Sequence, residues 1–207
     1  MSPHFDNIDA LIIAAGYSSR MGAFKPLLSF GDNNIIGTII QKLGALNTGS
    51  IIVVSGYNHE LLQSELREYP VHLILNEEYE RGMLSSIQCG LRAVSKTARG
   101  VIICLVDQPF IGVDMLRKIA AAFAEGSAGI VLPCYRGKHG HPVIISRKYF
   151  DEVFGLDESI GLRQLMQRHQ DDIYEVDVST DDILRDINTW EDYTRELETL
   201  KNQGKSQ

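Results

Sequence analysis

Hydrophobic residues along this chain follow two alternating patterns: short continuous apolar runs, and apolar positions at helical spacing. The first run opens at Leu11 and leads into a glycine-containing loop, and further runs predict strands at 51–56, 71–75, 100–106 and 128–132. Between them, apolar residues three and four apart predict helices at 35–46, 59–69, 84–94 and 115–124. Strands without polar alternation are buried on both faces. The pattern therefore predicts an α/β fold with a mostly parallel sheet and helices on both faces.

The last third of the chain is less regular. Its pattern predicts a hairpin-like excursion with a proline-containing edge at 138–146, a helix at 160–169, short strands at 173–178 and 183–187, and a closing helix at 190–200. No repeat or linker divides the chain, so we expect a single domain over residues 1–207. Within it, we interpret residues 133–190 as an insertion that walls one side of the cleft, the acceptor side, and residues 201–207 as a frayed tail.

Composition and charge narrow the class of protein. The chain has 207 residues, 44% of them hydrophobic and 23% charged, which is typical of one sizeable globular domain. No apolar run is long enough for a membrane span, and the first ten residues lack the pattern of a secretory signal, so we expect a cytoplasmic protein without a membrane partner. A net charge of −7 argues against a nucleic-acid partner.

Cysteine and histidine spacing indicates neither a disulfide framework nor a zinc site. Cys89, Cys104 and Cys134 are far apart, and His139 and His141 have no third ligand nearby in the sequence. No nucleophile elbow or cysteine–histidine pairing supports hydrolysis by a nucleophilic side chain.

The loop in residues 11–25 (LIIAAGYSSRMGAFK) has the composition of a phosphate-binding segment. It contains Gly16 and Gly22, whose neighbourhood lets backbone N–H groups converge on an anion, and the cationic residues Arg20 and Lys25. An ordinary strand-to-helix turn is the alternative. The glycine spacing fits neither a Walker A loop nor a dinucleotide fingerprint.

Candidate metal ligands follow at the ends of other predicted strands. Asp107 ends an apolar strand and suits Mg2+, which prefers carboxylates and substrate phosphates, although a turn-capping role is the alternative. Asn188 could complete the Mg2+ shell or cap the last helix, and Asp186 competes with it because strand alternation would put both on one face. His141 could be a structural loop residue or a substrate contact.

Five motifs together make the chain similar to the MobA-like NTP transferase family, and within it to the molybdenum cofactor cytidylyltransferase branch. They are LIIAAGYSSRMGAFKPLL at 11–28, NEEYERGMLSSIQCGL at 76–91, LVDQPF at 105–110, GHPVII at 140–145 and DINTWEDY at 186–193. The resemblance implies a three-layer Rossmann-like nucleotide-diphospho-sugar transferase fold. It also implies a Mg2+-dependent transfer of CMP from CTP to the phosphate of a molybdopterin-type acceptor, with a molybdoenzyme or its chaperone as a further partner.

The resemblance also assigns residues to roles. Arg20 and Lys25 would act on the phosphates, Asp107 and Asn188 on Mg2+, and His141 and Asp186 on the acceptor. The nucleotide-binding set that it implies is Ala14, Ala15, Gly16, Ser18, Ser19, Arg20, Lys25, Asn76, Gly82, Met83, Ser86 and Asp107.

Two features of the sequence leave alternatives open. Relatives often have an aspartate where this chain has Asn188, and the stretch LDESIGLRQL matches the family's acceptor motif only loosely. Ala15 resembles the cytidylyl version of the loop, because guanylyltransferases typically have Gly-Gly there. The alternatives are a guanylyl- or sugar-phosphate nucleotidyltransferase, or a non-catalytic carrier of a nucleotide or of molybdenum cofactor.

Overall fold

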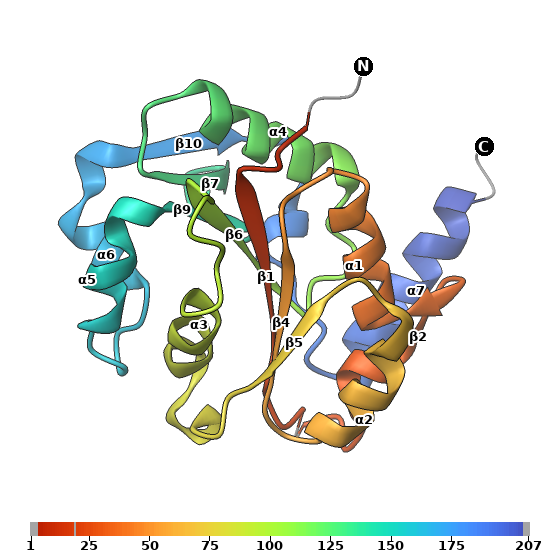
Figure 1. Ribbon diagram of the computed structural model, residues 1–207. Helices are drawn as coiled ribbons and strands as arrows, with labels where there is room; N and C mark the ends of the chain where they lie inside the picture. The colour runs from red at the N-terminus through yellow and green to blue at the C-terminus, as the bar shows by residue number, and fades with distance from the viewer. Residues whose placement is uncertain (1–3, 19, 205–207) are drawn as a thin grey trace.

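One mixed sheet forms the centre of the protein. The computed structural model describes residues 4–18 and 20–204, with side chains as far as residue 202. Eight strands lie in the order β10-β7-β9-β6-β1-β4-β5, with β8 paired to β7 (Figure 1). The strands are β1 (Ile8–Ala14), β4 (Ile51–Ser55), β5 (His72–Leu75), β6 (Gly100–Leu105), β7 (Ile130–Tyr135), β8 (Lys138–His139), β9 (Val143–Ser146) and β10 (Ile173–Asp177); β2 (Ser29–Phe30) and β3 (Asn33–Asn34) form a separate pair.

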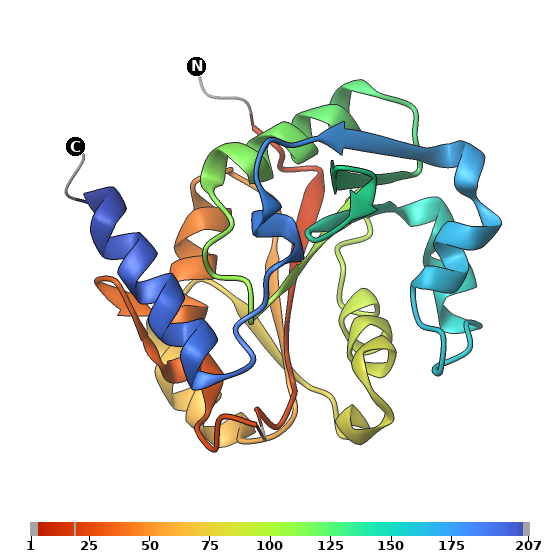
Figure 2. The same ribbon diagram turned by 180° about the vertical axis from the view of Figure 1, so that it is seen from behind.

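Helices cover both faces of this sheet, so the protein has three layers. The helices are α1 (Ile35–Gly44), α2 (His59–Glu65), α3 (Met83–Leu91), α4 (Val113–Glu125), α5 (Phe150–Phe154), α6 (Arg163–Arg168) and α7 (Trp190–Gly204). Core residues of α1, α2 and α4 pack on one face, and those of α3, α5 and α6 pack on the other. Figure 2 shows α7 outside the first layer, beside α1 and the β2–β3 pair. Among the described residues, no helix is long and apolar enough to cross a bilayer.

The central strand β1 shows why its sequence reads as a continuous apolar run. Ala10 and Ile12 face the core under α1 and α4, whereas Leu11 and Ile13 face the core under α3. Alternating residues of a strand point to opposite faces, so burial of both faces requires apolar residues at every position. The strands and helices predicted before residue 133 are all present with shifted ends, and the predicted α/β class is confirmed.

The prediction of a hairpin-like excursion at residues 138–146 is wrong in its placement of the second strand. β9 lies inside the sheet, antiparallel to both β6 and β7. Its apolar residues are buried on both faces, with Ile144 in one core and Val143 and Ile145 in the other. Pro142 precedes the strand, so its missing N–H removes no hydrogen bond from the ladder.

The predicted strand at residues 183–187 is also wrong. The chain forms a 3-10 turn over Asp181–Leu184 and then runs as irregular chain to α7. Ile183 and Ile187 are both buried. The apolar spacing that predicted a strand therefore reflects two isoleucines that pack into the core from an irregular segment. The Ile187 N–H donates to the backbone oxygen of Asp107 at 2.9 Å, which holds this segment against the end of β6.

A close approach of α3 to the sheet gives a test of this packing. A Cβ at Gly90 would lie 2.2 Å from Leu11 Cδ1 and 2.9 Å from Val54 Cγ2. We therefore expect Gly90→Ala to lower the free energy of unfolding by about 1–3 kcal/mol, measured by urea denaturation. Gly44→Ala is the matched control, because a Cβ there meets nothing within 4 Å and alanine favours the helix by about 0.5–1 kcal/mol. Equal stability of the two variants would contradict the close packing of α3.

Candidate nucleotide and metal site

The candidate site lies at the edge of the sheet where its parallel strands end. β1 is parallel to β4 and β6, and β4 is parallel to β5, so their carboxyl ends meet at the lower edge in Figure 1. Ligands of open α/β sheets bind in this position. A cavity of about 230 Å³ opens here, lined by Ile13, Ala15, Gly16, Ser18, Lys25, Pro26, Tyr79, Gly82, Met83, Ser86, Leu105, Val106 and Asp107.

The loop that follows β1 turns sharply and is held at both ends. Ser18 and Gly22 adopt positive φ angles of 53° and 63°, and the Met21 N–H donates to the Ser18 oxygen at 3.1 Å. At the start of the loop, the Ala15 oxygen accepts from the Tyr57 N–H at 3.1 Å. Near its end, the Trp190 indole N–H donates to the Met21 oxygen at 2.8 Å. The first turn of α7 therefore fixes the loop that carries the cationic residues.

Lys25, Asp107 and Asn188 meet beside this cavity, although they are far apart in the sequence: Lys25 and Asp107 line it, and Asn188 contacts Lys25. The Lys25 ammonium lies 3.6 Å from Asp107 Oδ2 and 3.4 Å from Asn188 Oδ1. Lys25 is only 7% exposed. Burial raises the pKa of the Asp107 carboxyl, the charge of Lys25 lowers it, and the nearby Asp186 raises it further. The net direction is upward, so the site disfavours the charge that Asp107 carries at neutral pH.

The donor set fits a hard divalent cation. Asp107 Oδ1 is buried and has no hydrogen-bond partner among the described residues. The amide oxygen of Asn188 lies beside the same ammonium. A carboxylate and an amide oxygen, together with triphosphate oxygens, are ligands that Mg2+ accepts. A turn-capping role for Asp107 is not supported, because its free oxygen has nothing to cap.

Asn188 is available for this role because its neighbours cap α7. The Thr189 hydroxyl accepts from the Asp192 N–H at 3.1 Å, and the Asp192 carboxylate accepts from the Thr189 N–H at 2.9 Å. This reciprocal pair is a capping box. The Asp192 carboxylate also accepts from the Asn188 backbone N–H at 3.1 Å. The hydrogen bond from Arg195, together with those from Thr189 and Asn188, lowers the pKa of Asp192 to about 2. The Asn188 side chain is thus left to face Lys25.

The two residues predicted to bind the acceptor lie in different places: His141 lines a second, larger cavity, and Asp186 lies near Asp107. His141 lines a cavity of about 930 Å³ and its Nδ1 is buried without a hydrogen-bond partner among the described residues. Burial lowers the pKa of His141, with the Ile103 backbone and Asp186 opposing the shift. Asp186 accepts from Gln108 Nε2 at 2.9 Å. Because 185–189 is not a strand, the predicted strand alternation of Asp186 and Asn188 is wrong.

The structure brings most of the predicted nucleotide-binding set together. Of that set, the residues that line the smaller cavity are Ala15, Gly16, Ser18, Lys25, Gly82, Met83, Ser86 and Asp107. Ser19 lies outside the described residues. Three others do not line the cavity: Ala14, buried within β1; Arg20, exposed on the loop; and Asn76, buried beneath α3. Asn76 donates to Ser85 Oγ at 2.9 Å and Ser86 Oγ at 3.0 Å, so it positions the start of α3.

Sequence reasoning missed one wall of the site, which is aromatic. Tyr79 lines the smaller cavity. Its ring centroid lies 5.2 Å from that of Tyr17, which in turn lies 5.1 Å from that of Tyr57. Tyr79 falls within the motif at 76–91, but nothing in its spacing separated it from a surface tyrosine.

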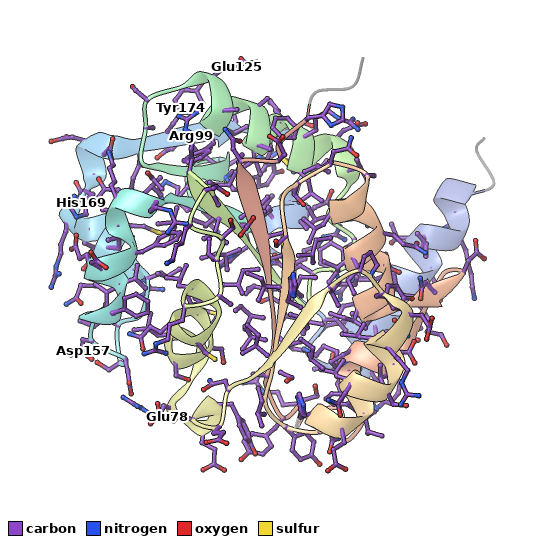
Figure 3. All side chains as sticks on the ribbon, in the orientation of Figure 1. Glu78, Arg99, Glu125, Asp157, His169 and Tyr174 are labelled. Carbon is purple, nitrogen blue, oxygen red and sulfur yellow. The ribbon has the colours of Figure 1, made fainter. Side chains whose placement is uncertain are left out.

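Met83 lines both cavities, so they adjoin at the first residue of α3. The larger one is bounded by α6 and by Tyr174 on β10, which is labelled in Figure 3. Two neighbouring cavities at the ligand-binding edge of the sheet can hold a nucleotide and a second substrate side by side.

The family model of the MobA-like NTP transferase domain matches residues 10–173. The chain belongs to this family. Molybdenum cofactor cytidylyltransferase of Escherichia coli (strain K12) is 31% identical over 188 residues, covering 90% of this chain and 93% of that protein. Purine catabolism protein PucB of Bacillus subtilis (strain 168) is 30% identical over 77% of this chain and 80% of its own.

A solved structure has the same fold. Rv0371c from Mycobacterium tuberculosis H37Rv superposes with a TM-score of 0.83 and 27% identity, covering 95% of this chain and 99% of that one. As a member of the MobA-like NTP transferase family, the chain is a nucleotidyltransferase, and the predicted family, fold class and enzyme class are confirmed.

The upward shift of the Asp107 pKa predicts a pH-dependent effect of Asp107→Asn on stability. Above its raised native pKa, ionised Asp107 lowers the free energy of unfolding; below the unfolded-state pKa of about 4, this cost is absent. Without divalent cations, we therefore expect Asp107→Asn to be more stable than wild type at about pH 7, and the difference to vanish below about pH 4.

Urea denaturation at both pH values measures this difference. Asp114→Asn is the control, because the Asp114 side chain is 98% exposed and should change stability little. A loss of stability in Asp107→Asn at neutral pH would mean that the ion pair with Lys25 outweighs the cost of burial.

Proposed function

We propose that this protein is a Mg2+-dependent cytidylyltransferase that transfers CMP from CTP to the phosphate of a molybdopterin-type cofactor and releases pyrophosphate. The convergence of Asp107 and Asn188 on Lys25, with Lys25 and Asp107 lining the smaller cavity, carries this proposal. The adjoining larger cavity offers space for the acceptor. The similarity to the Escherichia coli enzyme of that name supports the choice of nucleotide and acceptor.

The proposed reaction needs charge neutralisation and positioning more than a general base. An oxygen of the acceptor phosphate attacks the α-phosphorus of CTP, and the bond from that phosphorus to the oxygen bridging to the β-phosphate breaks. The attacking oxygen is already anionic, so no proton has to be removed from it. Lys25 in the cavity, with Arg20 on the exposed loop beside it, would offset the negative charge that otherwise keeps the two phosphates apart.

Asp107 and Asn188 would hold the Mg2+, which neutralises charge on the triphosphate and on the leaving pyrophosphate when it is bound. Asn188 is neutral, so this pair would hold the ion more weakly than two carboxylates. Lys25 now pairs with Asp107, and its ammonium is within reach of the same cavity. A cation at Asp107 would release Lys25 toward the phosphates.

Acceptor binding is assigned to the larger cavity. The downward pKa shift of His141 keeps its ring neutral at pH 7, so it would bind the acceptor by hydrogen bonding rather than by charge. Asp186, held by its hydrogen bond from Gln108, would contact the acceptor from beside Asp107. Most residues that line the larger cavity come from the segment 133–190. A molybdoenzyme or its chaperone, as the recipient of the product, and a cytoplasmic location stay predictions.

Turnover with separate nucleotides tests the proposal. Purified protein with Mg2+ and molybdopterin should release pyrophosphate with CTP and only slowly with GTP. Asp107→Ala should reduce this release by about 100- to 1,000-fold, because it removes the charged metal ligand. A preference for GTP would contradict the cytidylyl assignment, and no release with any nucleotide and acceptor would favour a carrier.

Ala15 gives a sharper test of base choice. It is 3% exposed and lines the smaller cavity, so its methyl group takes up space that a larger base would need. We expect Ala15→Gly to raise the ratio of kcat/KM for GTP over CTP by about tenfold or more, as one methyl group can in a close-fitting pocket. Ala10→Gly, in the preceding strand β1 and facing the core, should leave the ratio unchanged. An unchanged ratio in Ala15→Gly would show that base choice lies elsewhere.

A further inference from the structure

A second group of metal-binding side chains lies at the carboxyl ends of β7 and β10. Cys134 on β7 is the register partner of His139 on β8. On the other side of β7, Leu132 is the register partner of Glu175 on β10. Leu132 and Cys134 are two residues apart on one strand, so the side chains of Cys134 and Glu175 lie on the same face of the sheet. This face is the one covered by α3, α5 and α6.

The three side chains converge on one point. His139 Nε2 lies 2.6 Å from Glu175 Oε1, and Glu175 also shares a hydrogen bond with the Cys134 thiol. One ligand atom from each residue lies within 4.8 Å of the other two. Cys134 is buried, whereas His139 and Glu175 are exposed and line the larger cavity. An ion could therefore enter from the cavity and reach the thiol.

We propose that Cys134, His139 and Glu175 form a Zn2+ site on the wall of the larger cavity. Bonds of about 2.0–2.3 Å in a tetrahedral zinc site separate its ligand atoms by about 3.3–3.8 Å. The present group reaches that spacing by side-chain movements of about 1 Å. A thiolate and an imidazole select a softer cation than Mg2+, so this site differs in kind from the all-oxygen site at Asp107.

The position of the group implies an open coordination site. Three protein ligands leave the fourth tetrahedral position to water or to a molecule in the cavity. The two exposed ligands face that cavity, so a soft donor atom on a bound acceptor could fill the fourth position. Sequence spacing could not predict this site, because the strand pairing of β7 with β8 and β10 brings together residues up to 41 positions apart.

Cobalt spectroscopy and zinc affinity test the proposal on the whole 207-residue chain. Co2+ should bind with a thiolate-to-metal charge-transfer band, and Zn2+ should bleach that band at one equivalent. Cys134→Ser should abolish the band, and Glu175→Gln and His139→Gln should weaken zinc affinity by about tenfold or more in competition with a chelator. Cys89→Ser is the matched control, because Cys89 lies on α3 outside the group.

Two further arms separate this site from the proposed catalytic site. Asp107→Ala should leave the cobalt band and the zinc affinity unchanged, whatever it does to turnover. A cobalt spectrum without a thiolate band would overturn the proposal and leave His139 and Glu175 as an ordinary surface ion pair. Zinc affinity lost in Asp107→Ala but retained in Glu175→Gln and His139→Gln would also overturn it.

Discussion

The contact between buried Lys25 and partly buried Asp107 is the interaction on which the site depends. The parallel pairing of β1 and β6 places their carboxyl ends side by side, and the loop after β1 brings Lys25 to Asp107. Their charges offset each other in a place where either alone would be costly to bury. The pKa of Asp107 is nevertheless raised, so Lys25 alone does not fully offset the cost of burying the carboxylate. A divalent cation, with its higher charge, would stabilise the ionised carboxylate more. Such a site is suited to exchange a lysine for a metal ion and phosphates.

The C-terminal segment completes the site by a series of local constraints. The Ile187 N–H binds the backbone of Asp107, the Thr189–Asp192 capping box starts α7, and Asn188 between them is turned toward Lys25. Trp190 holds the Met21 end of the loop after β1. The loop and the candidate metal ligand are therefore positioned by the same turn.

Much of the fold could be predicted from the sequence, since apolar periodicity reports directly on burial. It succeeded for β1, whose two faces are both buried, and failed for 183–187, where two buried isoleucines anchor an irregular segment. The placement of β9 in the sheet could not be read from periodicity, because strand order depends on contacts between distant segments. Loop composition and position at a strand end pointed to Lys25 and Asp107, but the buried, structural role of Asn76 and the group around Cys134 emerged only from side-chain contacts.

The most direct measurement is a crystal structure of the protein with CTP and Mg2+. We expect a triphosphate in the cavity between the loop after β1 and α3, Mg2+ bound by Asp107 and Asn188, and Lys25 moved from Asp107 to the phosphates. Binding of CTP elsewhere would contradict the proposed site, as would a triphosphate in this cavity with Lys25 still paired with Asp107 and Mg2+ bound to neither Asp107 nor Asn188.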